Sequence, residues 1–242
     1  MKTDYNHAYN HAIAAHYAAY RPSLHSTILE KVLPEDPMFL KGLDVGCGTG
    51  YSTLALAKYC SNVIGIDPSQ SMLDRATEYP NVKYVEGSGE EIPLPDDSID
   101  IVTLAGSLFY INLNKAASEI RRVCRKEAVI IPYDFKIQLN ETLALLGLDH
   151  QTTKKEYDHT VNFSGVDGFK EIVNKQDQIN IECTGAQLAH LLLSDPNRYN
   201  RIAKKFETEN PFRKLKESLI KSGNHFFVKA NLFYSKYHLG EE

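Results

Sequence analysis

Apolar and polar residues along the middle of the chain follow two alternating patterns. Short apolar runs predict strands at 41–45, 62–67, 81–86, 99–105 and 127–132. The segments between them predict helices at 51–60, 69–79 and 113–125. Strands that alternate with helices of this length predict an α/β fold, with a doubly wound, mostly parallel sheet and helices on both faces.

The segments that follow extend this pattern to seven strands. After Pro132 we expect helices at 136–148 and 166–174, a strand at 178–183, helices at 184–194, 196–208 and 211–221, and a final strand at 225–237. No glycine-, serine- or proline-rich linker divides the chain, so we expect a single domain over 1–242. Its expected parts are N-terminal helices (1–40), a core (41–135), a helical insertion with strand six (136–224), and a final strand and tail (225–242).

Aromatic residues mark one face of the expected N-terminal helix. They recur three or four residues apart, at Tyr5, Tyr9, Ile13, Tyr17 and Tyr20. The stripe fits either a helix packed on the domain or a lid over a small ligand, since tyrosine offers both a ring and a hydroxyl. His7 and His11 are also four apart, but without an HExxH pattern they fit a solvated face, and no metal site is expected.

Composition narrows the functional classes. The 242 residues carry a net charge of −4 with an isoelectric point near 6.1, which disfavours nucleic acid as a partner. No run of about 18 apolar residues predicts a membrane span, and the first residues lack the apolar core of a secretory signal, so a cytoplasmic location is expected. The four cysteines have no metal-ligand spacing and are expected to be reduced and structural: Cys47, Cys60, Cys124 and Cys183.

The most informative stretch is 43–50, where an apolar run and an acid precede three glycines in the spacing G-x-G-x-G. This order fits a buried strand, a loop that a ligand approaches closely, and a helix. A dinucleotide fingerprint has the spacing G-x-G-x-x-G and receives a pyrophosphate, whereas Asp44 beside this loop favours a ligand that carries a cation. Asp67 ends the next expected strand, where doubly wound folds bind a ribose.

These residues resemble the class I S-adenosylmethionine-dependent methyltransferases over about 24–132. The resemblance implies a Rossmann-like fold and S-adenosyl-L-methionine as cofactor. Leu43-Asp44-Val45-Gly46-Cys47-Gly48-Thr49-Gly50 resembles the family's first motif. That motif implies that Asp44 and the backbone at Gly46, Cys47, Gly48 and Gly50 hold the methionine end of the cofactor.

Two further motifs resemble those of the family. Ile66-Asp67-Pro68-Ser69-Gln70-Ser71-Met72-Leu73 is similar to the second, which implies that Asp67 binds the ribose beside Pro68 and that Met72 packs on the adenine. The stretch 87–100 is similar to the third, which implies adenine contacts at Ser88, Gly89 and Glu90. The family usually has Asp where this chain has Ser88, whose neutral hydroxyl is a weaker acceptor for the adenine amino group. Ala105 and Gly106 are small enough for close approach to the methionine moiety.

The acceptor side is less defined. Tyr17-Ala18-Ala19-Tyr20-Arg21-Pro22 resembles a branch that includes trans-aconitate methyltransferases, which implies that Tyr17 and Arg21 lie near the cofactor carboxylate. Phe109 and Tyr110 are expected to shape an acceptor pocket. A neutral acceptor would need a base, for which the catalytic residue is unknown and the candidates by position are His16, Tyr110, Tyr133 and Asp134.

We therefore expect S-adenosylmethionine-dependent methyl transfer to a small-molecule carboxylate, hydroxyl or amine, by a monomer or homodimer. The alternatives are a catalytically silent cofactor-binding or regulatory protein, and a methyltransferase acting on tRNA or protein. A nucleotide-dependent oxidoreductase is a further rival, which the glycine spacing disfavours. The stretch 198–221 carries eight Lys or Arg against three Glu and fits either a solvated basic face or attraction of an acidic acceptor.

Overall fold

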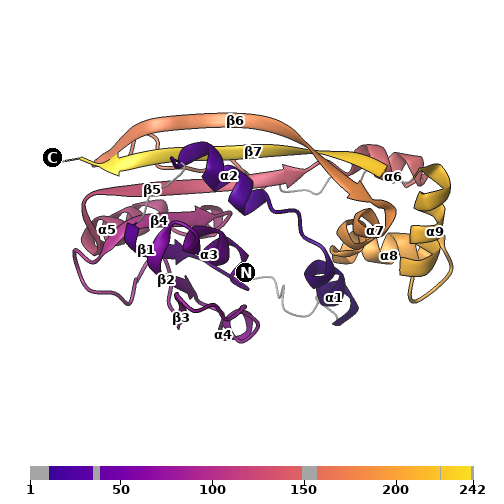
Figure 1. Cartoon of the computed structure of the whole chain (residues 1–242), viewed down its shortest axis with the longest axis horizontal. Coiled ribbons are helices and arrows are strands. Elements are labelled where there is room, and N and C mark those ends of the chain that lie inside the picture. The colour runs from indigo at the N-terminus through magenta and orange to yellow at the C-terminus, as the bar shows by residue number, and fades with distance from the viewer. Residues whose placement is uncertain (1–10, 35–38, 149–156, 224, 241–242) are drawn as a thin grey trace. The chain divides into compact units, whose positions relative to one another are not determined.

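A seven-stranded sheet in the order β3-β2-β1-β4-β5-β7-β6 organises the structure (Figure 1). The computed structural model describes residues 11–34, 39–148, 157–223 and 225–240. The strands are β1 (Phe39–Val45), β2 (Cys60–Asp67), β3 (Val82–Glu86), β4 (Ile99–Ala105), β5 (Cys124–Ile137), β6 (Phe169–Thr184) and β7 (His225–Leu239). The prediction of a doubly wound, mostly parallel, seven-stranded sheet is confirmed.

Helices separate most of the first five strands, with none between β3 and β4, and they dominate the later part of the chain. They are α1 (His11–Ala19), α2 (Leu24–Val32), α3 (Tyr51–Ala57), α4 (Gln70–Leu73), α5 (Leu113–Val123), α6 (Asn140–Leu145), α7 (Gly185–Leu193), α8 (Pro196–Lys205) and α9 (Phe212–Ser222), with a 3₁₀ turn at Leu108–Tyr110. The chain divides into two compact units. Unit 1 takes 1–22, 137–154 and 178–231, and unit 2 takes 23–136, 155–177 and 232–242. The expected single domain and its internal boundaries stay predictions.

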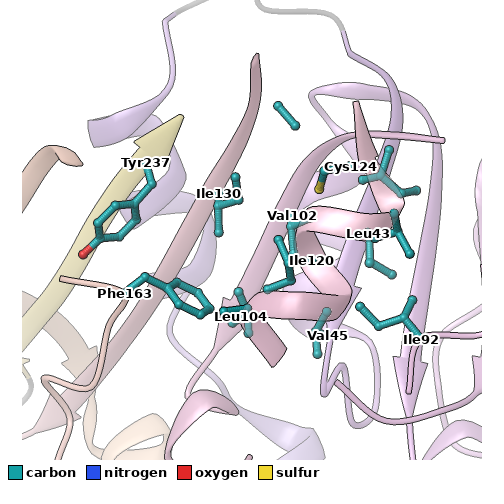
Figure 2. Packing of buried hydrophobic residues seen from close by; sticks show 14 of the residues in the cluster. Leu43, Val45, Ile92, Val102, Leu104, Ile120, Cys124, Ile130, Phe163 and Tyr237 are labelled. Carbon is teal, nitrogen blue, oxygen red and sulfur yellow. The ribbon is translucent and has the colours of Figure 1, made fainter. Parts of the chain in front are cut away.

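Unit 2 contains the parallel part of the sheet, with strand order reversing between β1 and β4. Leu43 and Val45 of β1 point toward α5 and join a core that Figure 2 shows around Val102, Leu104 and Ile120. The alternate residues of β1 face α3, because a strand turns successive side chains to opposite faces. Helices therefore cover both faces, and the carboxyl ends of β1 and β4 meet at the point where such sheets bind ligands.

Unit 1 is largely helical. Its core is made by apolar residues of α1, α6, α7, α8 and α9 together with one residue each of β6 and β7, Cys183 and Val228. Helix α7 begins with a capping box, in which Thr184 and Gln187 exchange side-chain to backbone hydrogen bonds. None of the helices in the part of the chain that the structure describes combines the length and apolar composition needed to cross a membrane.

Several of the predicted elements are wrong in type or length, including the strand expected at 127–132, which extends over Cys124–Ile137 as β5. The helix expected at 166–174 is replaced by β6, which begins at Phe169 and contains the strand expected at 178–183. The helix expected at 69–79 ends at Leu73. The helix expected at 136–148 is shortened to α6, because β5 continues to Ile137. Tyr5, His7 and Tyr9 lie outside the described residues, as do 149–156.

Candidate functional site: the glycine loop and the end of strand β4

The loop between β1 and α3 is fastened to β2 and keeps three glycines in left-handed conformations. The amides of Gly46 and Cys47 both donate to the Ile66 carbonyl, at 2.8 and 2.9 Å. The φ angles of Gly46, Gly48 and Gly50 are +73°, +55° and +86°, a region that other residues enter at a cost. The predicted loop that breaks a strand and enters a helix is therefore present in unit 2.

The three glycines are required for different reasons. A Cβ on Gly46 would lie 2.4 Å from Cβ of Ser107, and one on Gly50 would lie 2.2 Å from the Tyr84 hydroxyl. A Cβ on Gly48 would meet nothing within 4 Å. Packing within the protein thus explains Gly46 and Gly50, whereas the side of Gly48 is open to a ligand.

Asp44 supports the loop from inside the protein. Its side chain is fully buried, and its carboxylate accepts hydrogen bonds from Ser52, Thr53 and Thr103 at 2.6, 2.7 and 2.8 Å. Burial raises the pKa of this carboxyl, and the three hydroxyl donors oppose that shift. Contact between Asp44 and the cationic end of a ligand stays a prediction.

Asp67 joins the second predicted motif to the glycine loop. Its Oδ2 accepts from the Gly48 amide and its Oδ1 from the Ser69 amide, both at 2.9 Å. Each oxygen has a second lone pair for a further donor such as a ribose hydroxyl. Pro68 follows directly, and Met72 on α4 is 41% exposed, which is unusual for an apolar side chain that only fills a core.

The third predicted motif is arranged as a tight loop after β3. Ser88 forms an isolated bridge with Glu91, and Gly89 is buried, with space for no Cβ beside Ile111. Glu90 accepts from the Asn112 amide at 2.9 Å and pairs with Lys115 at 3.2 Å. The bond from the Asn112 amide, followed by those from Lys115, lowers the pKa of Glu90. This carboxylate therefore holds the start of α5, and its adenine contact stays a prediction.

Strand β4 ends beside the glycine loop. The chain passes from Ala105 to Gly106, which has φ +68°, and Ser107 donates to the Val45 carbonyl. A Cβ on Gly106 would lie 3.2 Å from Oδ1 of Asp134. The backbone carbonyl of Gly106 accepts a hydrogen bond from the Tyr157 hydroxyl at 2.7 Å. The backbone at Gly106 thus packs against polar side chains of the chain itself, and its close approach to the methionine moiety stays a prediction.

A histidine paired with a carboxylate lies at this end of the sheet. Nδ1 of His159 is 2.8 Å from Oδ2 of Asp134, and the Phe135 amide donates to Oδ1 of the same carboxylate at 2.7 Å. Tyr157 packs against His159 with ring centroids 4.6 Å apart. A narrow cavity is lined by these three side chains together with Leu104, Gly106, Leu108, Phe109, Tyr133, Asp158 and Val161.

Three of the four positional candidates for a base lie at this end of the sheet. Asp134 lines the cavity, and Tyr110, 75% exposed, lies with its ring centroid 5.7 Å from that of Tyr157. Tyr133 is buried with its hydroxyl 3.0 Å from Nδ1 of His25, and burial raises its pKa further from the neutral range. Tyr157 and His159 were missed, because they lie in a polar stretch without periodicity. The pairing of His159 with Asp134 could not be predicted from the sequence, because only the fold brings the two residues together.

The remaining predicted site residues lie in unit 1. Nδ1 of His16 is 2.9 Å from Nδ1 of His190, and burial lowers the pKa of both imidazoles. The guanidinium of Arg21 lies 3.3 Å from the ring centroid of Tyr17, in a cation–π contact. The roles predicted for Tyr17 and Arg21 at the cofactor stay predictions.

The cysteines are all buried and free of disulfides. Burial raises the pKa of the Cys47 thiol, and the carboxylates of Asp44 and Asp67 raise it further. Burial also raises the pKa of Cys60 and of Cys124 to about 12. None of these thiols is activated as a nucleophile.

Residues 43–131, which hold the glycine loop, Asp67 and the end of β4, match the family model of a methyltransferase domain. Over this range the chain is therefore similar to methyltransferases. The match begins at Leu43, on the strand that leads into the glycine loop.

Two methyltransferases are similar to this chain over about half of its length. A ubiquinone/menaquinone biosynthesis C-methyltransferase of Campylobacter jejuni is 33% identical over 126 residues, 48% of this chain and 52% of that protein. A demethylmenaquinone methyltransferase of Staphylococcus aureus is 29% identical over 59% of this chain and 69% of its own length. The first curated relatives are matched over a third to about half of their length.

A solved structure supports the fold over most of the chain. The YcgJ protein of Bacillus subtilis has a TM-score of 0.54 and 18% identity, and the alignment covers 91% of this chain and all of that one. The methyltransferase domain match ends at Ile131. Asp134, Tyr157 and His159 follow it, so these three side chains lie outside the matched range.

Proposed function

We propose that this protein transfers the methyl group of S-adenosylmethionine to a small-molecule acceptor. The observation that carries the proposal is the bond between the Gly48 amide and Asp67, which sets a carboxylate beside the open side of a glycine loop. A nucleoside with an amino-acid tail fits this pair. The ribose hydroxyls donate to a carboxylate, and the tail needs a loop without side chains.

The surrounding residues fit the same cofactor. In the proposed arrangement the ribose lies on Asp67, the adenine packs on the exposed Met72, and Ser88 accepts from the adenine amino group. The methionine end lies along the backbone of 46–50. Asp44 supports this loop, because its carboxylate accepts hydrogen bonds from Ser52 and Thr53 at the start of α3. Each group thus meets a side chain of matching chemistry, and no metal ion is required.

Positioning is the main task left to the protein. When bound, the cofactor supplies a methyl group that its sulfonium already activates. The residues at the end of β4 then have to hold an acceptor atom in line with that methyl, about 3 Å away, in a site from which water is excluded. Phe109 and Tyr157, with ring centroids 4.4 Å apart, provide an apolar wall for this purpose.

The acceptor is proposed to be a planar small molecule. Two relatives are named for methylation in ubiquinone or menaquinone synthesis, which supports this class for the present chain. The alternative that follows from the segment 17–22 is a carboxylated acceptor of the trans-aconitate type. An Arg21→Gln variant tests the role proposed for that segment, since affinity for the cofactor's carboxylate should fall.

Calorimetric titration with S-adenosylhomocysteine, the demethylated cofactor, tests the proposal. We expect binding at one site per chain, no competing binding of NADH, and transfer of labelled methyl from S-adenosylmethionine to an acceptor. Absence of binding overturns the proposal. Binding without transfer to any acceptor in a broad screen instead favours a catalytically silent protein on this fold.

A further inference from the structure

We propose that His159, oriented by Asp134, is the general base of this protein and that it ionises an aromatic hydroxyl on the acceptor. The inference rests on the proposed function and names the acceptor chemistry of the same site. The three observations behind it are the bond between the two side chains, the rings that clamp the imidazole, and the place of both residues beside the end of β4.

The bond to Asp134 determines which nitrogen of His159 can act as a base. A carboxylate only accepts hydrogen bonds, so Nδ1 carries the hydrogen and donates to Oδ2 of Asp134 over 2.8 Å. The neutral ring then has its lone pair on Nε2. No partner for Nε2 is found among the described residues, and the side chain is 21% exposed. This is the arrangement in which an imidazole takes a proton while a carboxylate steadies the resulting cation.

The imidazole is held rigidly from both sides. The ring of Phe233 stacks on it with centroids 5.5 Å apart and planes 11° apart, and Tyr157 meets it edge-on. The backbone beside it is also pinned, because Asp158 accepts from both the amide and the hydroxyl of Thr160. A base has to be held in place to within a fraction of an ångström, and these contacts supply that order.

The pair lies next to the cofactor loop. Asp134 packs against Gly106, where a Cβ would lie 3.2 Å from its Oδ1. Ser107, which follows Gly106 in the chain, packs against Gly46 of the glycine loop. The chain of contacts from the glycine loop to His159 thus passes through two adjacent residues at the end of β4. These contacts place the imidazole at the same end of the sheet as the proposed cofactor site, where a base can act on the acceptor.

The neighbouring side chains favour a flat acceptor with a hydroxyl. Phe109, Tyr110 and Tyr157 form a cluster of rings, with centroids 4.4 to 5.7 Å apart, on which a planar molecule can stack. A carboxylate acceptor is already ionised and needs no base, whereas an aryl hydroxyl does.

The proposed step involves the acceptor, S-adenosylmethionine and His159, and it needs no other reactant. The acceptor's O–H bond breaks and its proton moves to Nε2 of His159, which leaves the electron pair on the acceptor. That pair forms the new bond to the methyl carbon while the carbon–sulfur bond breaks, and its electrons remain on sulfur in S-adenosylhomocysteine. The imidazolium beside Asp134 then returns its proton to water.

Among the described residues, several other titratable groups line a cavity together with His159. They are Tyr133 and Asp134 of β5, Tyr157 and Asp158 on its own segment, Lys175 of β6 and Tyr234 of β7. Burial and the nearby Asp134 raise the pKa of Tyr157, so this phenol stays neutral and does not compete as a base.

A coloured acceptor analogue tests the inference directly. We choose 4-nitrophenol, titrated into protein saturated with S-adenosylhomocysteine in mild acid, where the free probe is mostly un-ionised. The wild-type protein is expected to bind it as the coloured phenolate, with about tenfold more ionisation than in solution. His159→Gln should bind it un-ionised, and Asp134→Asn should show an intermediate ionisation, since it weakens only the orientation of the ring.

The matched control is His238→Gln. His238 bonds to the Glu127 carbonyl at the opposite end of β5, so its loss should leave the colour unchanged. If 4-nitrophenol fails to bind, or binds equally ionised to wild type and His159→Gln, the inference is overturned. If His159→Gln does not fold, the wild-type titration decides, because a bound probe no more ionised than the free one also overturns it.

Kinetics separates a catalytic from a structural role. With any accepted phenol, His159→Gln should lower kcat by about 10²- to 10⁴-fold with little change in KM, and should remove the fall in activity on the acid side of the pH profile. Unchanged S-adenosylhomocysteine affinity in this variant isolates the inference from the proposed function. If the wild-type protein does not bind S-adenosylhomocysteine, the proposed function itself is overturned.

Discussion

The Gly48 amide donates a hydrogen bond to Oδ2 of Asp67 over 2.9 Å. This bond joins the ends of two adjacent parallel strands, since Val45 of β1 pairs with Ile66 of β2. Asp67 therefore has two functions in the proposed site: it sets the shape of the glycine loop, and it offers its remaining lone pairs to a ribose. The variants below separate loop structure from ligand contact.

Gly46→Ala and Gly48→Ala should differ in their effects on stability. Both substitutions place a side chain at positive φ, which costs about 1–2 kcal/mol. Gly46→Ala adds a collision with Ser107 and should lower the free energy of unfolding by more. Gly48→Ala should remain folded but lose affinity for S-adenosylhomocysteine. Urea unfolding and calorimetry measure the two quantities, and equal destabilisation by both substitutions would contradict the distinction drawn between these glycines.

Ser88→Asp should strengthen cofactor binding. A carboxylate accepts a stronger hydrogen bond from the adenine amino group than a hydroxyl does, which predicts an increase in affinity of about 3- to 10-fold. Ser71→Asp, on α4, is the control for added negative charge. An equal change in both variants, or weaker binding by Ser88→Asp, would argue against an adenine contact at this position.

Asp44→Asn should alter how stability depends on pH. A carboxyl with a raised pKa in the folded protein binds its proton more tightly than in the unfolded chain, so its contribution favours folding in acid and is lost as the pH rises through the raised pKa. The free energy of unfolding of wild type relative to Asp44→Asn should therefore fall from about pH 4 upward. Urea unfolding across pH checks this, and a difference that does not vary with pH contradicts it.

Glu90→Gln should affect stability without affecting the cofactor. The pKa of Glu90 is lowered, so its contribution is present above the unfolded pKa and lost as the pH falls through the folded one. At neutral pH the variant should melt at a slightly lower temperature, because the start of α5 loses an ionised acceptor. Its affinity for S-adenosylhomocysteine should match that of Glu91→Gln. A selective loss of affinity would instead assign Glu90 to the adenine.

Much of the region around the glycine loop could be predicted from the sequence because its signals are local. Glycines at positive φ, an acid at a strand end and alternating elements each have a recognisable pattern, and Met72 could be placed through the motif around it. Strand β6 gave no such signal. It lies at the edge of the sheet with most of its side chains exposed, and the apolar residues Val166, Phe169, Ile172 and Val173 fall three or four apart or side by side, which mimics a helix.

The polar pair beside β4 could not be predicted for a different reason. Asp134 and His159 are separated by 25 residues, and only the folded sheet brings their side chains to 2.8 Å. Nothing in the local composition around His159 distinguishes it from a surface loop residue. Position after a strand indicated Asp134 alone, without its partner.

A crystal structure with S-adenosylhomocysteine bound tests the central claim most directly. We predict that both ribose hydroxyls lie within hydrogen-bond distance of the Asp67 carboxylate, that the amino-acid end follows the open side of Gly48, and that the sulfur faces the end of β4. A nucleoside bound elsewhere, or a ribose that does not touch Asp67, would contradict the account.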